Sequence, residues 1–417
     1  MQLSAFASAF RTPDLRKKLL FVLGIIAVFR IGSVVPTPGV DYGAVQRCVD
    51  QAQENPILGL VNLFSGGALL QLSVFALGIM PYITASIIMQ LLTVVIPRLE
   101  TLKQEGQSGQ SKITQYTRYV TIGLSVLQST SILTLARTPG RLIPGCNEDL
   151  IPDESIFLLI VMVFVLTAGT SLIMWLAELV TDKGVGNGMS VLIFTSIIAT
   201  FPGQLMNIYR SNGVFTFVLT LAVGVFTIAG VVFVEQAQRR VPVQYAKRMV
   251  GRKQYGGTST YIPLKVNMAG VVPVIFASSI LYIPSLVVNL SGSTAPWAQW
   301  IATNLGRGEH WVYLTMYAVL IIFFTYFYVA ITFNPKETAE NFKSYGGFIP
   351  GIRPGKNTAE YLDFVLTRLT MVGSLYLIVV CLIPEFLISR LSVPFYFGVT
   401  SLMIVVNVTI NTAQQVQ

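Results

Sequence analysis

An uncharged apolar run from Leu72 to Ile96 constrains the fold of this chain more than any other stretch. At about 1.5 Å of rise per helical residue, the run is long enough to cross a membrane as a helix. Pro81 predicts a bend within that helix, and Ile79 and Ile83 are expected on one of its faces because they lie four residues apart. The two isoleucines either build a narrow apolar site or pack against neighbouring helices and lipid.

The stretch that precedes this run, residues 57–70, is apolar but interrupted by small and polar residues. It is too short to span a membrane, and its glycines weaken any helix that it forms. Irregular backbone at membrane depth is tolerated where protein surrounds it. We therefore expect a re-entrant half-helix that enters a cavity of the protein.

The composition places the whole chain in a membrane. Hydrophobic residues make up 53% of the 417 residues and charged residues only 11%, against about a quarter in soluble domains. The predicted fold is an all-α polytopic membrane protein with ten transmembrane helices, expected at 19–35, 72–96, 119–135, 156–179, 189–206, 215–234, 268–290, 311–333, 366–383 and 393–408. They group into two five-helix halves, residues 1–206 and 207–417, as in many transporters built around a central site.

Basic residues are concentrated in alternate connections between the spans. The N-terminus and the second, sixth and eighth connections are rich in lysine and arginine, whereas the intervening connections hold few. By the positive-inside rule, both termini and the long loops at about 235–267 and 334–363 are cytoplasmic. This topology accounts for most of the net charge of +9. Arg30 lies inside the first span near its outer end, where we expect its side chain to reach the membrane surface rather than serve transport.

Residues for enzymatic or ion-coupled chemistry are scarce in the sequence. The only histidine, His310, lies in an external connection, and the three cysteines have no metal-ligand spacing. The sequence has no glycine-rich phosphate loop, so we expect no catalytic residue, metal or cofactor, and nucleotide energy has to come from a partner. Coupled transporters usually bury Asp, Glu or Lys at mid-membrane, and no predicted span has one at its centre. An ion-coupled small-solute transporter is therefore the second hypothesis, after a passive channel.

Six stretches, in order along the chain, carry the most distinctive motifs. They are SKITQYTRY (111–119), TDKGVGNGMS (181–190), QRRVPVQYAKR (238–248), IPLKVNMAGVVPVIFASS (262–279), GGFIPGIRPGKNTAEYL (346–362) and FYFGVTSLMIVV (395–406). Together they closely resemble the SecY family of bacterial protein-conducting channels. The resemblance implies the central channel subunit of the Sec protein translocase in the bacterial cytoplasmic membrane. Such a subunit passes unfolded secretory proteins across the membrane and releases hydrophobic segments laterally into lipid.

The pore ring and the plug of that family carry over residue by residue. The resemblance places the ring on six apolar residues, with a methionine where isoleucine is common: Ile79, Ile83, Met189, Ile193, Ile275 and Ile404. A narrow apolar collar disfavours water and hydrated ions at rest, yet it admits an extended chain without specific hydrogen bonds. The plug falls on the re-entrant stretch, whose glycines make it easy to displace: Gly59, Asn62, Phe64, Ser65, Gly66 and Gly67.

The resemblance also implies a lateral gate between spans two and three on one side and spans seven and eight on the other. Three amides are candidates for polar contacts across this gate: Gln90, Gln128 and Asn267. The alternative is that each amide satisfies a neighbouring backbone group, since interhelical bonds of this kind average only about 0.6 kcal/mol.

A cytoplasmic docking surface is implied on the basic sixth and eighth connections. Its candidate residues are Arg239, Arg240, Lys247, Arg248, Arg252, Lys253, Arg353 and Lys356, unless these charges only set the topology. Arg353 differs from the others because the turn PGIRPG fixes the direction of its guanidinium group. The implied partners are the small membrane subunits SecE and SecG, the SecA motor ATPase, the ribosome, signal sequences and nascent chains, and membrane lipids.

Two cysteines lie on the predicted external face. Cys48 is in the first connection and Cys146 in the third, where an oxidising environment permits a disulfide. A bond would link the segment that precedes the plug to the loop between the third and fourth spans. The alternative is a pair of unbonded thiols, because a bridge requires the two Cα atoms to lie within about 7 Å of each other.

Overall fold

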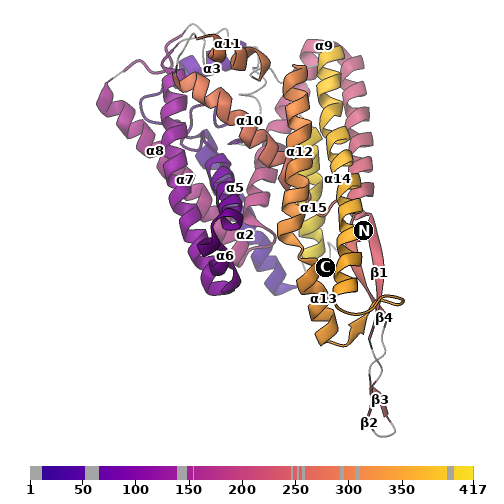
Figure 1. The fold of residues 1–417 in the computed structure, drawn as a ribbon. Helices are drawn as coiled ribbons and strands as arrows, with labels where there is room; N and C mark the ends of the chain where they lie inside the picture. The colour runs from indigo at the N-terminus through magenta and orange to yellow at the C-terminus, as the bar shows by residue number, and fades with distance from the viewer. Residues whose placement is uncertain are drawn as a thin grey trace.

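The computed structural model describes residues 12–51, 65–138, 148–153, 155–245, 248–250, 253–255, 259–291, 295–305, 310–391 and 399–416. Within these ranges the chain is mostly helical, as predicted. Long helices run side by side, and a β-hairpin projects from one end of the molecule (Figure 1).

The N-terminal group of helices consists of α2 (Pro13–Val34), α5 (Met80–Val95), α7 (Gln107–Ala136) and α8 (Ile156–Lys183), with the short α3 (Tyr42–Gln51) after α2. Helix α7 packs against both α5 and α8, and α2 packs against α8. Small and β-branched residues at intervals of four line the buried face of α7 and let its neighbours approach closely: Gly109, Ile113, Thr117, Thr121, Ser125 and Ser129.

The second predicted span is shorter than its apolar run. Helix α5 begins at Met80, and residues 66–79 form turns and an isolated bridge instead of a helix. The reason is backbone pairing with the chain that follows α2: Thr37 N–H donates to Leu72 O, and Val74 N–H donates to Val35 O. Pro81 lies in the first turn of α5, where its missing N–H is harmless. The predicted bend at Pro81 is therefore wrong, since the proline begins the helix.

A sharp bend does occur at the other end of this helix. Ile96 has an extended conformation, and Pro97 opens the short helix α6 (Pro97–Gln104). The axes of α5 and α6 differ by 100°. Because proline is favoured in the first turn of a helix but disrupts its interior, the second apolar run ends where α6 turns away.

The C-terminal group begins inside α9 (Gly188–Gln236). Gly213 has φ 79° and ψ 178°, which are not helical, so α9 contains the fifth and sixth predicted spans as two segments. The group continues with α10 (Val272–Ser291), α12 (Trp311–Thr332), α14 (Lys356–Leu391) and α15 (Val399–Val416), and with the short helices α11 (Pro296–Asn304) and α13 (Pro335–Ser344). Helix α12 packs against α10 and α14, and α15 packs against α9 and α14. Figure 1 shows α10 leaning from this group toward α7, and it contacts both α7 and α5.

A small β structure extends from the end of the molecule that carries α13. Strand β1 (Gln238–Tyr245) pairs antiparallel with β4 (Ser259–Lys265), and its end pairs with β5 (Gly347–Phe348). Strands β2 (Arg248–Val250) and β3 (Lys253–Tyr255) pair with each other farther out (Figure 1). The sequence predicts only a basic loop here. The strand signal was nevertheless present, because buried Val241 and Val243 alternate with exposed residues along β1.

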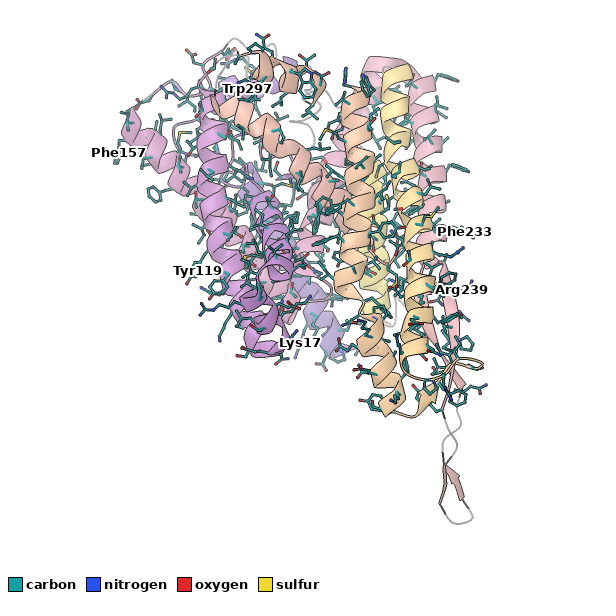
Figure 2. The ribbon with its side chains drawn as sticks, viewed as in Figure 1. Lys17, Tyr119, Phe157, Phe233, Arg239 and Trp297 are labelled. Carbon is teal, nitrogen blue, oxygen red and sulfur yellow. The ribbon has the colours of Figure 1, made fainter. Side chains whose placement is uncertain are left out.

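Five helices of the described chain are long and apolar enough to cross a membrane, or six if the bent pair α5 and α6 is one span. Large apolar side chains cover their outer surface: Phe157 of α8 and Phe233 of α9 are each 78% exposed and point away from the ribbon (Figure 2). Lys17 and Arg239 lie toward the end from which β1 projects, and Trp297 lies at the opposite end. An apolar belt between polar ends is the surface that lipid requires, so this is a multi-pass membrane protein.

We predict that Gly169 of α8 is required for close packing on the turn segment before α5. A Cβ at Gly169 would collide with the carbonyl group of Val74, a backbone atom that cannot move aside cheaply. Gly169→Ala should therefore lower the stability of the protein by about 1–3 kcal/mol, seen as a lower thermal midpoint in detergent. Gly123→Ala on α7 is the matched control, because nothing lies within 4 Å of a Cβ there and alanine favours the helix. Equal midpoints for the two variants would contradict the prediction.

Candidate functional site

The six residues that the resemblance assigns to a pore ring belong to one apolar cluster of the structure. They come from four helices that are distant in sequence: Ile79 and Ile83 at the start of α5, Met189 and Ile193 on α9, Ile275 on α10 and Ile404 on α15. Four of them are 1–6% exposed, and Met189 and Ile275 are partly buried against the same cluster. The fold therefore brings the six side chains into one apolar region.

Local backbone structure sets the position of each pair in this cluster. The Ile83 N–H donates to the Ile79 carbonyl at 3.1 Å, so the two residues stack one turn apart although Ile79 precedes α5. On α9, the Asn187 side chain caps the helix by accepting from the Met189 N–H. Ile193 follows Met189 by one helical turn. Each pair therefore lies along one helical face.

The chemistry available in this cluster is exclusion rather than catalysis. Apolar side chains disfavour water and ions, and they offer no specific hydrogen bonds. Among the residues that the structure describes, no three His, Cys, Asp or Glu side chains are grouped to hold a metal.

The described end of the predicted plug lies inside the helical bundle. Ser65 and Gly66 are buried and Gly67 is partly buried, while Gly59, Asn62 and Phe64 lie outside the described residues. The Ser65 hydroxyl accepts a hydrogen bond from the Leu69 N–H at 3.1 Å. Irregular backbone is thus surrounded by protein at this point, which is the condition for its presence in a membrane.

Arg30 differs from its expected arrangement. Instead of extending to the membrane surface, its Nη1 atom donates to the Gly66 carbonyl at 3.1 Å. The expectation from the sequence was wrong because it considered only the position of Arg30 along the span. The contact depends on a segment 36 residues away, which no local pattern around Arg30 indicates.

The three gate amides have different surroundings. Gln90 is exposed on α5, Gln128 is partly buried on α7, and Asn267 is buried just before α10. Asn267 donates to Glu235 Oε1 at 2.7 Å and to the Gly270 carbonyl at 3.2 Å. These partners belong to the C-terminal group, so Asn267 has a local structural role. A gate role for any of the three amides remains a prediction.

An ion pair that the sequence analysis did not predict connects α7 to α8. The Arg118 guanidinium donates to both carboxylate oxygens of Glu178 at 2.9 and 2.8 Å, and also to Gln115. Two parallel hydrogen bonds from arginine to a carboxylate fix geometry as well as supplying energy. Each charge lies near the end of a predicted span, and only the helical packing shows that they pair.

The candidate docking residues lie on the β structure and on the turn after β5. Arg239 and Arg240 are exposed on β1, with the Arg240 guanidinium 4.8 Å from the ring centre of Tyr261. Arg353 is exposed, while its carbonyl accepts from the Thr358 hydroxyl at 3.0 Å. Three further candidate docking residues are Arg248 on β2, Lys253 on β3 and Lys356 at the start of α14. Lys247 and Arg252 lie outside the described residues.

The first and third connections are held together beside Cys48. Arg47 donates to both carboxylate oxygens of Glu148, with Nη2 2.7 Å from Oε2, and the Asp41 N–H donates to the Leu150 carbonyl at 3.1 Å. The hydrogen bonds and positive charge of Arg47 lower the pKa of Glu148 from its ordinary value. The ion pair is therefore present at neutral pH and is lost only as the pH falls through that lowered pKa.

The cysteines themselves are only partly described. Cys48 is buried in α3 and is disulfide-bonded. Cys146 lies outside the described residues, two positions before Glu148. Cys381 is buried in α14. The specific pairing of Cys48 with Cys146 remains a prediction.

Comparison with known proteins places this geometry in a family. The family model described as SecY matches residues 73–413. The protein translocase subunit SecY of Streptomyces scabiei is 60% identical over 424 residues, which cover 100% of this chain and 97% of the relative.

Solved structures share the fold at low sequence identity. A SecY structure, described as showing that the plug domain stabilises the closed state of the translocation channel, matches with a TM-score of 0.64 and 16% identity, over 96% of this chain and 91% of that one. Sec61 in the canine ribosome–channel complex matches with a TM-score of 0.61 and 13% identity, over 96% and 91% of the two chains. The extent of the family match and the full-length identity to the Streptomyces protein show that this chain belongs to the SecY family.

Proposed function

We propose that this chain is the channel subunit of a Sec protein translocase, which passes unfolded secretory proteins across a bacterial cytoplasmic membrane. The observation that carries the proposal is that Ile79, Ile83, Met189, Ile193, Ile275 and Ile404, from four distant helices, all belong to the largest buried apolar cluster of the helical bundle. The chain that carries them is 60% identical to a protein named as a translocase subunit.

The apolar cluster acts as the seal of the channel at rest. Ions keep their hydration shells only at high cost in a narrow apolar constriction, so the collar blocks them when no chain is present. An extended polypeptide of any sequence passes because the collar makes no specific hydrogen bonds. The predicted plug at residues 57–70 adds a second barrier, and Arg30 of α2 donates a hydrogen bond to its Gly66 carbonyl.

Lateral release into lipid occurs between the two groups of helices. Helix α10 contacts α5 and α7 and belongs by packing to the C-terminal group with α12. Separation of α10 from α5 and α7 would open a path from the apolar cluster to the bilayer. Ten spans in two halves, residues 1–206 and 207–417, with both termini cytoplasmic, complete this arrangement.

Cytoplasmic partners dock on the β1–β4 hairpin and on the turn that carries Arg353. A structural neighbour of this chain is Sec61 in a ribosome–channel complex, and we extend ribosome binding to this chain together with the SecA motor. The exposed guanidinium groups of Arg239 and Arg353 suit RNA phosphates or partner carboxylates. SecE and SecG are the membrane partners proposed for the assembled translocase.

Replacing Ile193 or Ile404 with asparagine is predicted to raise the resting ion conductance of the reconstituted protein in planar bilayers. A polar side chain at either buried position would let water enter the constriction. Passage of a preprotein with an intact signal sequence should persist, and passage of one with a defective signal should increase.

Ile198→Asn is the matched control, because Ile198 lies on the same helix as Ile193 but is 45% exposed. Its conductance should stay near that of the unmodified protein. Unchanged conductance in both Ile193→Asn and Ile404→Asn would remove the ring assignment. Conductance that follows a small solute gradient, without preprotein transport, would support a coupled transporter instead.

We also propose that Cys48 pairs with Cys146. The proposal is supported by the disulfide state of Cys48 and by the Arg47–Glu148 ion pair, which holds together the two connections that carry these cysteines. The bond closes a loop of about a hundred residues, for which chain-entropy estimates reach about 4.7 kcal/mol in soluble proteins. A smaller effect is expected here because the spans between the cysteines are already held in the membrane.

Non-reducing peptide mass spectrometry checks this pairing. The protein is alkylated at low pH, digested and compared with a sample that was reduced first. We expect a linked peptide containing Cys48 and Cys146 that disappears on reduction. Full alkylation of both cysteines before reduction would show that the bond does not form.

A further inference from the structure

The Arg30 guanidinium connects α2 to the described end of the predicted plug. Its Nη1 atom donates to the Gly66 carbonyl at 3.1 Å in a partly buried position. Arg30 is the only charged residue between Leu19 and Val34 of this helix. A hydrogen bond with an ionised donor is roughly twice as strong as a neutral one, and it strengthens further away from water. This contact is therefore a strong link between the first span and a segment distant in sequence.

Gly66 is fitted tightly at the point where Arg30 meets it. Its φ is 70°, in the left-handed region that favours glycine. A Cβ at Gly66 would lie 3.3 Å from Ser196 Cα of α9 and 3.4 Å from Arg30 Nη1. Gly67 also has a positive φ, of 90°, but a Cβ there would meet Thr200 Cγ2 at an ordinary 3.9 Å. The backbone of Gly66 is thus closely packed between Arg30 of α2 and Ser196 of α9, whereas the space around Gly67 would admit a Cβ atom.

The residues that follow Gly66 are attached to the same helix by their backbone. Leu72 and Val74 exchange hydrogen bonds with Thr37 and Val35, which come directly after α2. Leu72 and Val74 are therefore attached by their backbone to the residues that directly follow α2. The Arg30 contact at Gly66 therefore lies in the last part of the predicted plug, residues 57–70, shortly before these paired positions.

We propose that Arg30 is a positioning residue that holds the root of the plug in the closed channel by bonding the Gly66 carbonyl. The inference deepens the proposed channel function and rests on it. We call this hydrogen bond between Arg30 and the Gly66 carbonyl the latch. Because its acceptor is a backbone carbonyl, the latch does not depend on the side chains of the plug itself. Displacement of the plug requires this bond to break, so Arg30 favours the closed state.

Two substitutions of Arg30 separate the latch from a merely structural role. Arg30→Met keeps an unbranched side chain without a donor, and Arg30→Lys keeps the charge as a single point. Each is combined with Ser65→Cys, which reports exposure of the plug root through labelling by a membrane-impermeant maleimide added outside. Background labelling is measured in the same Arg30 variants without the Ser65→Cys substitution. Position 65 is buried in this structure, so slow labelling is expected while the plug stays in place.

We expect Arg30→Met to raise the labelling rate at position 65 by about ten-fold or more, as for the loss of a hydrogen bond to a charged group. Resting conductance in planar bilayers should rise with it, while preprotein transport and the thermal midpoint stay close to those of the unmodified protein. Arg30→Lys should give an intermediate result. Unchanged labelling and conductance in Arg30→Met would overturn the latch.

Gly66→Ala and Gly67→Ala provide a matched pair that leaves Arg30 in place. Both substitutions force alanine into a positive φ, but only the first displaces the carbonyl that Arg30 holds. Gly66→Ala should therefore raise the resting ion conductance in planar bilayers, and Gly67→Ala should raise it much less. Equal leakage from both would refute the latch even if Arg30→Met failed to accumulate. If Ile193→Asn raises the resting conductance while Arg30→Met does not, the channel function stands and the latch is refuted. Absence of preprotein transport by the unmodified protein, reconstituted with its membrane partners and the motor ATPase, would refute the channel function itself.

Discussion

Burial of a non-helical segment inside a bundle of membrane helices is the constraint on which the other features of this structure depend. Residues 66–79 form turns and an isolated bridge and are buried or partly buried, so their backbone groups need partners within the protein. The chain after α2 supplies part of the pairing, through Thr37 and Val35. Gly169 of α8 supplies the room, and Arg30 supplies a donor for the Gly66 carbonyl. The same segment ends at Ile79, the first of the six proposed ring residues, which lies in the apolar cluster.

Polar contacts are placed near the ends of the helices, and the apolar cluster lies between them. Arg118 with Glu178 connects α7 to α8, and Asn267 with Glu235 connects the start of α10 to the end of α9. The Arg47–Glu148 pair joins the first and third connections. Such bonds fix the relative positions of helices without introducing charge among the six proposed ring residues. The proposed seal can therefore consist of apolar side chains alone.

The helices themselves could be predicted well from the sequence, because long apolar runs such as those of α8 and α12 have few alternatives in a membrane. The start of α5 could not, since apolar composition does not reveal that Leu72 and Val74 pair with the chain after α2. The β1–β4 hairpin was missed because the basic residues of this connection were interpreted as a docking loop, although the alternation of Val241 and Val243 was readable. Ile79 and Ile83 were paired by their spacing, but their assembly with Ile193 and Ile404 came from family resemblance. Periodicity within one helix does not show which helices meet.

Site-specific photo-crosslinking shows whether a polypeptide in transit touches the apolar cluster. A photoreactive residue is placed at position 83, 193 or 404, and for comparison at Phe226 of α9, which is 81% exposed on the outer surface. A preprotein is then arrested during transport through the reconstituted protein and irradiated. Passage through the cluster predicts crosslinks to the preprotein from positions 83, 193 and 404 and none from position 226. Crosslinks from position 226 alone, or equal crosslinking from all four positions, would contradict a channel sealed by this cluster.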